Sequence, residues 1–335
     1  LARHAFIARS LLRSLVTRGV FTEDEVGALL RSLHTVAREL TEDARRLALG
    51  TLSLPDFLVR YGHLRPGTYD ILSPRYDQRS DLFAGAQPSA NAETPPPFKP
   101  SAKQHKAIDR LLADDGFGIG SQALLDYISQ ATAAREYAKF VFTQGVSDGL
   151  EAIAAWGTDR GLSREDLSYL EWGDLAATAS VATFGTPEQL RAVVRQRKVD
   201  HETTVALRLP QLLFDEEGVH IVPLQLSAPN FITAEVVRGP CVRLAAHDQA
   251  PADMRGAVVL IENADPGFDW IFAHRIGGLI TKFGGVNSHM AIRCAEFGIP
   301  AAIGCGEQIF ERVAQAHAVE VDCAGAHIRP IGERS

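Results

Sequence analysis

The sequence predicts a protein with two structural regions, a mostly helical one over residues 1–225 and a compact α/β one over residues 226–335. Apolar residues recur at helical spacing through most of the first 200 positions. The pattern then changes to short strand-like segments, and residues 257–261 form a continuous apolar run typical of a central strand. A length of 335 residues suits two domains that each bury a core. The expected fold class is therefore multi-domain, α followed by α/β.

The composition is that of an ordinary globular protein, with 46% hydrophobic and 22% charged residues. The net charge of −7 argues against a nucleic acid or an anionic membrane as the main partner. We find no 18-residue apolar run and no signal peptide, so we expect a soluble, cytoplasmic protein. Four cysteines fall in the last third without Cys-x-x-Cys spacing, which favours buried free thiols over a zinc site or disulfides.

Residues 1–82 are predicted to be helical. Thr22 and Glu25 have the spacing of a capping box, and Ser53-Leu54-Pro55 opens a further short helix. The segment from about 84 to 102 contains five prolines among Ala, Gly and Ser, so it is predicted to be a linker or an extended excursion that cannot be helical.

Helical patterns return from about 103 to 200, with start signals at Ser163 and Thr186. Residues 205–209 and 219–224 are predicted to be short strands. Over 226–331 the pattern indicates strands from Asn230 onward and the central strand, then further elements in this order: a helix at 266–275, a strand at 278–281, a helix ending at Phe297, a strand at 301–304, and a terminal helix and strand.

One histidine, His289, stands where a strand gives way through a glycine turn to a helix. In the first helical turn, free backbone N–H groups and the positive end of the helix dipole favour anions. The same field disfavours imidazolium, so we expect an unprotonated, nucleophilic ring nitrogen. A phosphoryl group on that nitrogen would be held by the turn, for which the candidates are Gly284, Gly285, Asn287 and Ser288. The alternative is a core or capping histidine in an ordinary α/β turn.

Residues 277–304 resemble the signature of the phosphohistidine swivelling domain of PEP-utilising enzymes, as in phosphoenolpyruvate synthase and the rifampicin-phosphotransferase-like dikinases. The resemblance rests on Gly-Gly, Ser-His, Ala-Ile and Glu-Phe-Gly-Ile-Pro-Ala. It implies a compact β/β/α fold and makes His289 the phosphocarrier. Asn287, Met290 and Ala295 depart from the usual pattern, and Arg293 is expected to point off a different side of the helix from the arginine that Ala295 replaces.

The same resemblance gives the loop Glu262–Pro266 two interpretations. It could help form the phosphate-bearing face, or Asp265 could simply cap the following helix with Pro266 at its first position. The structural interpretation is favoured.

An acceptor site needs cations that neutralise the moving phosphoryl group. Arg135 and Lys139 are four residues apart and share a helix face, with Glu136 as a possible proton acceptor. A solvated Glu–Lys face would give the same spacing. An Arg-Glu-x-x-Lys sequence resembles the acceptor domain of the rifampicin-phosphotransferase-like dikinases, which favours a catalytic role for these three residues.

A second candidate lies in residues 60–70, where two glycines and a proline predict a rigid turn. By resemblance to Gly-His…Asp turns in the same dikinases, His63 is the expected proton carrier, and Arg65, Tyr69 and Asp70 are expected to bind substrate. A structural turn held by an Arg–Asp pair is the alternative.

The resemblance implies part of an ATP-dependent dikinase-type phosphotransferase that passes a phosphoryl group from an ATP-binding domain of the same longer polypeptide to a small-molecule acceptor. ATP and Mg²⁺ are implied on that other domain, and no metal site is expected here. The chain begins at Leu1, has no methionine before Met254 and lacks a Gly-x-x-x-x-Gly-Lys loop, so we expect a fragment without the donor site.

Two rivals remain from the sequence. A pyruvate-directed, phosphoenolpyruvate synthase-like enzyme would need a (β/α)₈ barrel that the pattern does not contain. A non-catalytic phosphohistidine binding or regulatory module would place Arg135 and Lys139 on an open convex surface that His289 does not reach.

Overall fold

The computed structural model of the chain describes residues 2–79, 81–83, 98–180, 185–207, 215–220, 228–246, 248–251 and 253–333. The first of its two parts, here called the helical region, contains the following helices: α1 (Ala2–Thr17), α2 (Glu23–Ser32), α3 (Val36–Ala48), α4 (Leu54–Tyr61), η1 (Tyr76–Gln78), α5 (Ala102–Asp114), α6 (Ser121–Thr158), α7 (Arg164–Ser168), α8 (Trp172–Ser180) and α9 (Pro187–Ala206). A short η2 (Glu217–His220) follows.

Side-chain caps begin these helices where the sequence predicted them. Thr22, Ser163 and Thr186 each form a capping box with the residue three positions later, and Ser53 caps α4. Such caps satisfy backbone N–H groups that have no partner within the helix. The predicted helix starts are therefore confirmed.

Three predictions about the helical region need correction. Of residues 62–79 and 81–83, only η1 is helical; the others form turns and irregular backbone, which include the turn predicted at Gly62 and Gly67. Val205 and Ala206 end α9 instead of opening a strand, and Val219 and His220 lie in η2. Residues 205–206 have strand-like composition, but they continue the capped 20-residue helix α9 to its end.

The two expected linkers fall largely outside the described residues. Of the proline-rich segment 84–102, only 98–102 is described, and its last residue, Ala102, already belongs to α5. The expected link near 225 lies outside the described residues altogether.

The second part, here called the sheet region, is built on one seven-stranded mixed sheet in the order β1-β5-β4-β3-β2-β6-β7. Its strands are β1 (Asn230–Ile232), β2 (Val236–Leu244), β3 (Val258–Asn263), β4 (Gly278–Phe283), β5 (Ala301–Ile303), β6 (Ala316–Asp322) and β7 (His327–Glu333). β2 through β5 are parallel, whereas β1, β6 and β7 pair antiparallel. Helices α10 (His289–Phe297) and α11 (Gly306–Ala314) and the 3₁₀ helix η3 (Pro266–His274) pack on it.

The order of elements in the sheet region is as predicted up to the end of the chain, where one strand more than expected occurs. The terminal helix is α11, and it is followed by the antiparallel pair β6 and β7. β2 bends between two partners, since Val236–Pro240 pairs with β6 and Cys241–Leu244 pairs with β3. The coarse expectation of helices followed by an α/β region is therefore confirmed.

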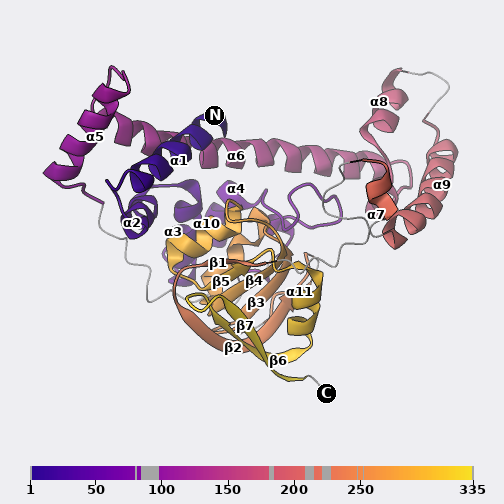
Figure 1. The fold of residues 1–335 in the computed structure, drawn as a ribbon. Helices are drawn as coiled ribbons and strands as arrows, with labels where there is room; N and C mark the ends of the chain where they lie inside the picture. The colour runs from indigo at the N-terminus through magenta and orange to yellow at the C-terminus, as the bar shows by residue number, and fades with distance from the viewer. Residues whose placement is uncertain are drawn as a thin grey trace.

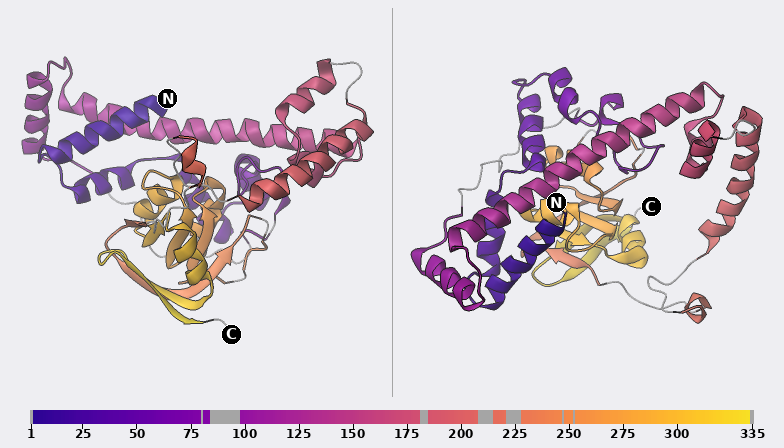
Figure 2. Two further views of the ribbon diagram at one scale, coloured as in Figure 1. Left: turned by 45° about the vertical axis from the view of Figure 1, so that its right-hand side comes forward. Right: turned by 90° about the horizontal axis from the view of Figure 1, so that it is seen from above.

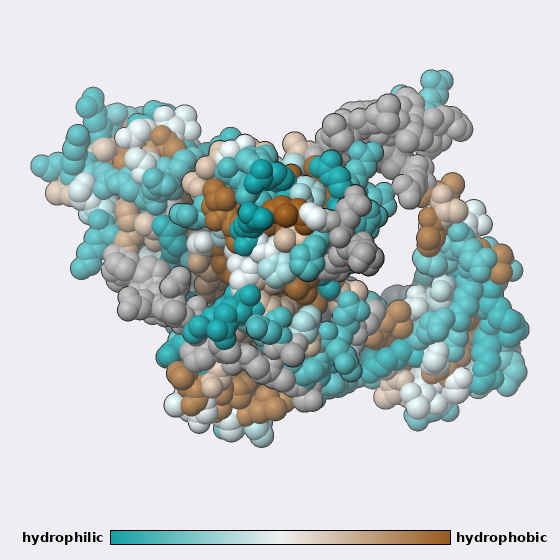
Figure 3. All heavy atoms as spheres, turned by 90° about the horizontal axis from the view of Figure 1, so that it is seen from below, coloured by the Kyte–Doolittle hydropathy of each residue, from teal (hydrophilic) through white to brown (hydrophobic). Residues whose placement is uncertain are grey.

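The long helix α6 spans the molecule, and the sheet region lies against its middle (Figures 1 and 2). α1, α2 and α5 gather at one end of α6, and α7 to α9 form an arm at the other. Seen from below, that arm presents mostly hydrophilic residues (Figure 3). The sheet region and the centre of α6 are thus adjacent.

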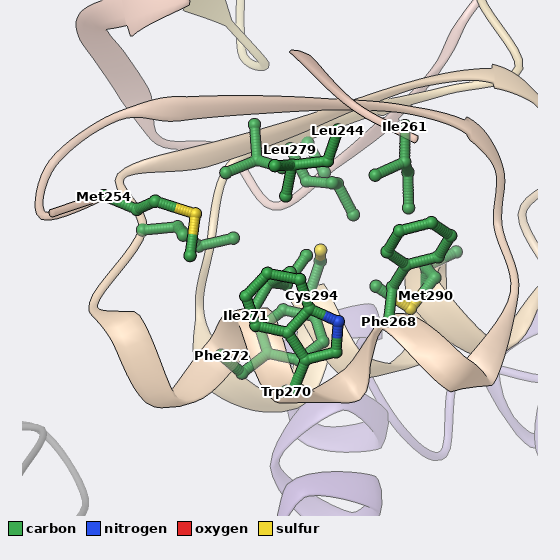
Figure 4. Packing of buried hydrophobic residues seen from close by; sticks show 14 of the residues in the cluster. Leu244, Met254, Ile261, Phe268, Trp270, Ile271, Phe272, Leu279, Met290 and Cys294 are labelled. Atoms are coloured by element: carbon green, nitrogen blue, oxygen red, sulfur yellow. The ribbon is translucent and has the colours of Figure 1, made fainter. Parts of the chain in front are cut away.

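A single buried cluster holds η3 and α10 in fixed positions beside the sheet (Figure 4). Phe268, Trp270 and Phe272 of η3 pack with Met290 and Cys294 of α10. Close packing of this kind allows little relative movement. The polar side chains that these two elements present to the helical region are therefore held in register with each other.

The turn segment 62–83 joins the two regions. Tyr76 and Leu82 are buried in the same cluster as η3, and the Tyr76 hydroxyl donates a hydrogen bond to the Gly267 carbonyl. At Gly267 the chains approach so closely that a Cβ atom would lie 1.7 Å from the Arg65 carbonyl oxygen. Glycine is required there by space alone.

Candidate functional site: a buried histidine between two carboxylates

His289 is the first residue of α10, as the sequence predicted. Ser288 is the N-cap, and its hydroxyl accepts a hydrogen bond from the Ala291 N–H at 3.3 Å. The turn before it needs glycine, because Gly284 has a φ of 132° and a Cβ on Gly304 would lie 2.2 Å from the Gly284 carbonyl oxygen. Gly284, Gly285 and Asn287 are exposed. Their role in holding phosphate stays a prediction.

The imidazole of His289 is enclosed by two carboxylates from different regions. Its Nε2 lies 2.9 Å from both carboxylate oxygens of Asp269 in η3. Its Nδ1 lies 3.5 Å from Oε2 of Glu136 in α6. The three side chains are 10%, 5% and 14% exposed, respectively. The ring thus bridges the sheet region and the helical region, and both of its nitrogens face acceptors.

The expected neutral imidazole is not what this environment favours. Burial alone would lower the pKa of His289, but the charge and hydrogen bonds of Asp269, together with Glu136, raise it to about 9. The prediction considered only the helix dipole, which contributes about 0.3–1 kcal/mol at an exposed site. Two nearby carboxylates outweigh it. With both carboxylates beside the ring, an imidazolium ion is favoured at neutral pH, in contrast to the neutral ring that the sequence predicted.

Asp269 is held ionised in the interior. Burial would raise the pKa of its carboxyl, but His289 and Arg293 lower it. The Arg293 Nε lies 3.5 Å from the nearer carboxylate oxygen of Asp269. A buried carboxylate is tolerated only with such partners. Asp269 was missed in the sequence because nothing in the 266–275 pattern distinguishes it from a solvated helix residue.

Arg293 turns toward the helical region. Its guanidinium is 1% exposed and donates to the Ala37 carbonyl at 2.9 Å and the Thr41 hydroxyl at 2.8 Å, both in α3. It also pairs with Glu296 at 2.7 Å and lies over the Phe297 ring. The sequence predicted that Arg293 points to a different side of α10 from position 295, and this placement agrees with that prediction. Its contacts with α3, which join the two regions, were not predicted.

Of the three residues predicted on α6, two reach the histidine. Glu136 and Lys139 line a cavity of about 40 Å³ together with His289 and Asp269. Arg135 does not line it; its guanidinium lies 5.6 Å from the centre of the Phe6 ring of α1 and 3.9 Å from Glu136. Burial would raise the pKa of Glu136, but His289, Arg135 and Lys139 together lower it. Lys139 and Glu136 therefore supply opposite charges beside the ring.

The cavity is small and largely apolar apart from these groups. A water molecule occupies about 30 Å³ in the liquid, so the space holds little more than one. Its remaining lining comes from α3, α6, η3 and the 62–83 segment: Val36, Ala37, Leu40, Leu64, Thr68, Phe140, Thr143, Pro266 and Gly267. A drug-sized ligand does not fit beside His289 in this arrangement.

The other predicted group, in residues 60–70, serves mainly to hold the turn. Arg65 is 2% exposed and donates to the Ser147 hydroxyl, the Ser73 carbonyl and Glu151. The Asp70 carboxylate accepts from the Leu72 N–H at 2.8 Å. The alternative of a structural turn accounts for these contacts, although Arg65 reaches the Asp70 backbone carbonyl rather than its side chain.

His63 and Tyr69, the remaining members of that group, lie in opposite environments. His63 is buried, packs against the Phe140 ring at 4.7 Å and does not line the cavity. Burial lowers the pKa of its ring. Tyr69 is 67% exposed. The structure does not bring these two side chains to His289, so the proton-carrying role of His63 and the substrate-binding role of Tyr69 stay predictions.

Asp265 caps η3, as the favoured interpretation held. Its carboxylate accepts from the Gly267 N–H at 2.7 Å, and Pro266 occupies the first turn. The same carboxylate accepts hydrogen bonds from the N–H and the hydroxyl of Thr68 at 3.3 Å. The cap therefore also joins the sheet region to the turn segment 62–83.

Two further observations concern groups elsewhere in the described residues. All four cysteines are buried and free, as predicted. In the parts of the chain that the structure describes, no three His, Cys, Asp or Glu side chains are grouped closely enough to hold a metal ion.

With this geometry in place, comparison with known proteins identifies the sheet region. Residues 253–325 match the family model of the PEP-utilising enzyme mobile domain. This part of the chain is therefore similar to the mobile domain of PEP-utilising enzymes. The match includes both Asp269 and His289.

Longer similarities extend into the helical region. The chain is 26% identical over 305 residues to a rifampicin phosphotransferase of Streptomyces sviceus, which covers 81% of this chain and 33% of that protein. It is 24% identical over 294 residues to a rifampicin phosphotransferase of Bacillus subtilis, covering 74% of this chain and 31% of that protein. The chain thus spans about a third of the length of the curated relatives it matches.

Among the described residues, no helix combines the length and the apolar composition that crossing a membrane requires.

Proposed function

We propose that this chain is the acceptor-binding and phosphohistidine portion of an ATP-dependent, dikinase-type phosphotransferase. The observation that carries the proposal is the meeting of His289 from the mobile domain with Glu136 and Lys139 of α6 at one buried cavity. A regulatory module whose histidine passes its phosphate nowhere would not need a lysine and a carboxylate of another region beside that ring.

The residues of this chain suit the discharge step. An oxygen of the acceptor bonds to phosphorus, the P–N bond to His289 breaks, and its electron pair stays on the ring nitrogen. Lys139 stabilises the negative charge of the moving phosphoryl group. Glu136, whose carboxyl is held ionised, accepts the acceptor's hydroxyl proton and passes it to the ring. Arg135 supports Glu136 through their ion pair.

The donor half of the reaction is proposed to belong to an ATP-binding domain of a longer polypeptide, with Mg²⁺ bound there. Support comes from the greater length of the relatives, of which this chain spans about a third. A carrier histidine divides one transfer between distant sites into two. The domain limits of 1–225 and 226–335 are part of the same proposal, since residues 221–227 lie outside the described range.

The acceptor is proposed to be a small molecule bearing a hydroxyl group. Rifampicin is the first compound to test, because the relatives are named for it. Pyruvate, which carries no alcoholic hydroxyl and would have to react through its enol oxygen, is the second candidate. Either one must enter while the two regions are apart, because the docked cavity of about 40 Å³ admits neither beside His289.

The carrier assignment is tested by supplying ATP labelled in either the β- or the γ-phosphate to the full-length protein. Label that survives alkali and is lost in acid is then measured on wild type and His289→Ala. We expect label on wild type alone. His327→Ala is the control, because this ring is half exposed on β7, away from the site. Equal labelling of wild type and His289→Ala would contradict the proposal.

A further inference from the structure

Asp269 contacts the ring of His289 but has no role in the reaction proposed above. Asp269 and His289 lie 20 residues apart in sequence, on η3 and α10, and both elements are fixed by the same buried cluster. Asp269 therefore accompanies His289 wherever the mobile domain goes. Glu136 does not, because it lies on α6 in the helical region.

Both oxygens of Asp269 are directed at one nitrogen, and the carboxylate is itself held in place. Its oxygens lie 2.9 Å from His289 Nε2, and Arg293 approaches from the other side at 3.5 Å. Only 5% of the Asp269 side chain is exposed, so water screens the interaction little. An anion this deeply buried requires a positive partner, and the histidine supplies it only when protonated.

We propose that Asp269 is a positioning residue that holds His289, once it has given up its phosphoryl group, as an imidazolium ion docked against α6. The proposal rests on the function proposed above. When the P–N bond breaks, the acceptor's hydroxyl proton takes the place of the phosphoryl group on the ring. If the other nitrogen already carries a proton, the ring becomes a cation with two N–H donors. Asp269 and Glu136 accept one each.

The charged carrier is excluded from this arrangement by the same geometry. A phosphoryl group on either nitrogen would replace an N–H that donates a hydrogen bond to a carboxylate. It would also place its own negative charge within about 3–4 Å of Asp269 or Glu136. The ring contacts seen here therefore belong to the discharged histidine, and during transfer the phosphorylated ring must face Glu136 and Lys139 at a wider spacing that leaves room for the phosphoryl group and the acceptor.

The groups that face the ring set its charge. Asp269 on η3 and Glu136 on α6 favour the cation, and Lys139 on α6 and Arg293 on α10 oppose it. The nearer carboxylate makes two contacts at 2.9 Å against one at 3.5 Å, so Asp269 is expected to contribute more than Glu136.

The test uses the unphosphorylated full chain with ¹³C-labelled histidine, and follows the Cε1 resonance of His289 as the pH is raised. His289→Gln identifies the resonance. In wild type we expect the pKa of His289 near the value of about 9 that the surroundings give it. Asp269→Asn should lower it by about 1 pH unit or more, and Glu136→Gln by less. Asp322→Asn, on β6 beside His327, should leave it unchanged.

An unchanged titration in Asp269→Asn, or a change no larger than in Asp322→Asn, would overturn the proposal. To exclude misfolding, the other histidine resonances, such as that of buried His274, must keep their positions in Asp269→Asn. Label uptake by His289 is a separate measurement. If wild type takes no label while Asp269→Asn still shifts the titration, the proposed function fails and the proton-holding role of Asp269 survives.

Discussion

At the scale of single residues, the charge of His289 is decided by neighbours that are remote in sequence. The position of the ring at a helix start follows from Ser288 and the two glycines before it, and this could be predicted. Its partners are a residue of η3 and a residue of α6, which only the tertiary fold brings together. Local reasoning therefore placed His289 correctly at the start of α10 but did not foresee the charge that its neighbours favour.

The pKa of His289 makes the stability of the docked protein depend on pH. The pKa in the folded state is raised above the ordinary value of 6.5 to about 9, so the stabilisation is complete below about pH 6.5 and is lost as pH rises through 9. Urea unfolding at pH 6 and pH 9.5 should show a loss of up to about 3 kcal/mol in wild type. His289→Gln lacks this titration, and an equal loss in that variant would contradict the assignment.

Glu151 gives a second prediction at this scale, with the opposite sign. Burial would raise the pKa of its carboxyl, but Arg164, Gln78 and Arg65 lower it to about 2. Its stabilisation is therefore present above its ordinary value of 4.5 and lost as pH falls toward 2. Glu151→Gln should destabilise the protein by about 1–3 kcal/mol at pH 7 and by much less near pH 2.

Glu202→Gln, at an exposed position of α9, is the matched control for Glu151→Gln. Chemical unfolding at both pH values provides the measurement. A pH-independent difference between Glu151→Gln and wild type would show that the carboxylate charge is not what holds the 62–83 turn to α6.

At the scale of elements, prediction from sequence succeeded where local chemistry decides. Capping boxes at Thr22, Ser163 and Thr186 fixed three helix starts, and the apolar run at 257–261 identified β3. The prediction of a helix was wrong for residues 71–79 and 81–83, where only η1 is helical and Tyr76 and Leu82 pack against η3. The two glycines and the proline of residues 60–70 indicate a turn, but the packing of Tyr76 and Leu82 is a tertiary contact that no local pattern indicates.

The closest approach between elements lies at Gly267, where η3 meets the 62–83 turn. Gly267→Ala would place a Cβ 1.7 Å from the Arg65 carbonyl oxygen. Because that oxygen is a backbone atom and cannot turn aside, η3 and the turn must separate. We expect a loss of about 1–3 kcal/mol in unfolding free energy, the usual cost of overpacking, and weaker docking of the sheet region. Thermal and urea unfolding measure the loss of unfolding free energy.

Gly149→Ala is the control for this substitution, since it lies within α6 with nothing near the added Cβ. It should be neutral or slightly stabilising, because alanine is the better helix former. If Gly267→Ala were as stable as Gly149→Ala, the tight contact between η3 and the turn would not exist in solution.

At the scale of the whole molecule, docking buries side chains from both regions in one cluster. Tyr76 and Leu82 are at most 1% exposed there, so movement of the sheet region away from α6 exposes them unless residues 62–83 move with it. Phosphorylation of His289 should therefore speed amide hydrogen exchange around Tyr76. Exchange in the first turns of α6 around Ile128, which packs in a separate cluster, should not change.

Equal protection of both segments before and after phosphorylation would show that the two regions stay docked with the charged carrier. That result would contradict the selectivity inferred for the site between Asp269 and Glu136.

The account as a whole requires that α6 receives what His289 carries. The most direct test loads His289 with labelled phosphate in the full-length protein, removes ATP, adds rifampicin and follows the label over time in wild type and Lys139→Ala. We predict that both variants load equally and that Lys139→Ala discharges about 100-fold or more slowly. Equal discharge rates would remove Lys139 from the mechanism and, with it, the assignment of α6 as the acceptor side.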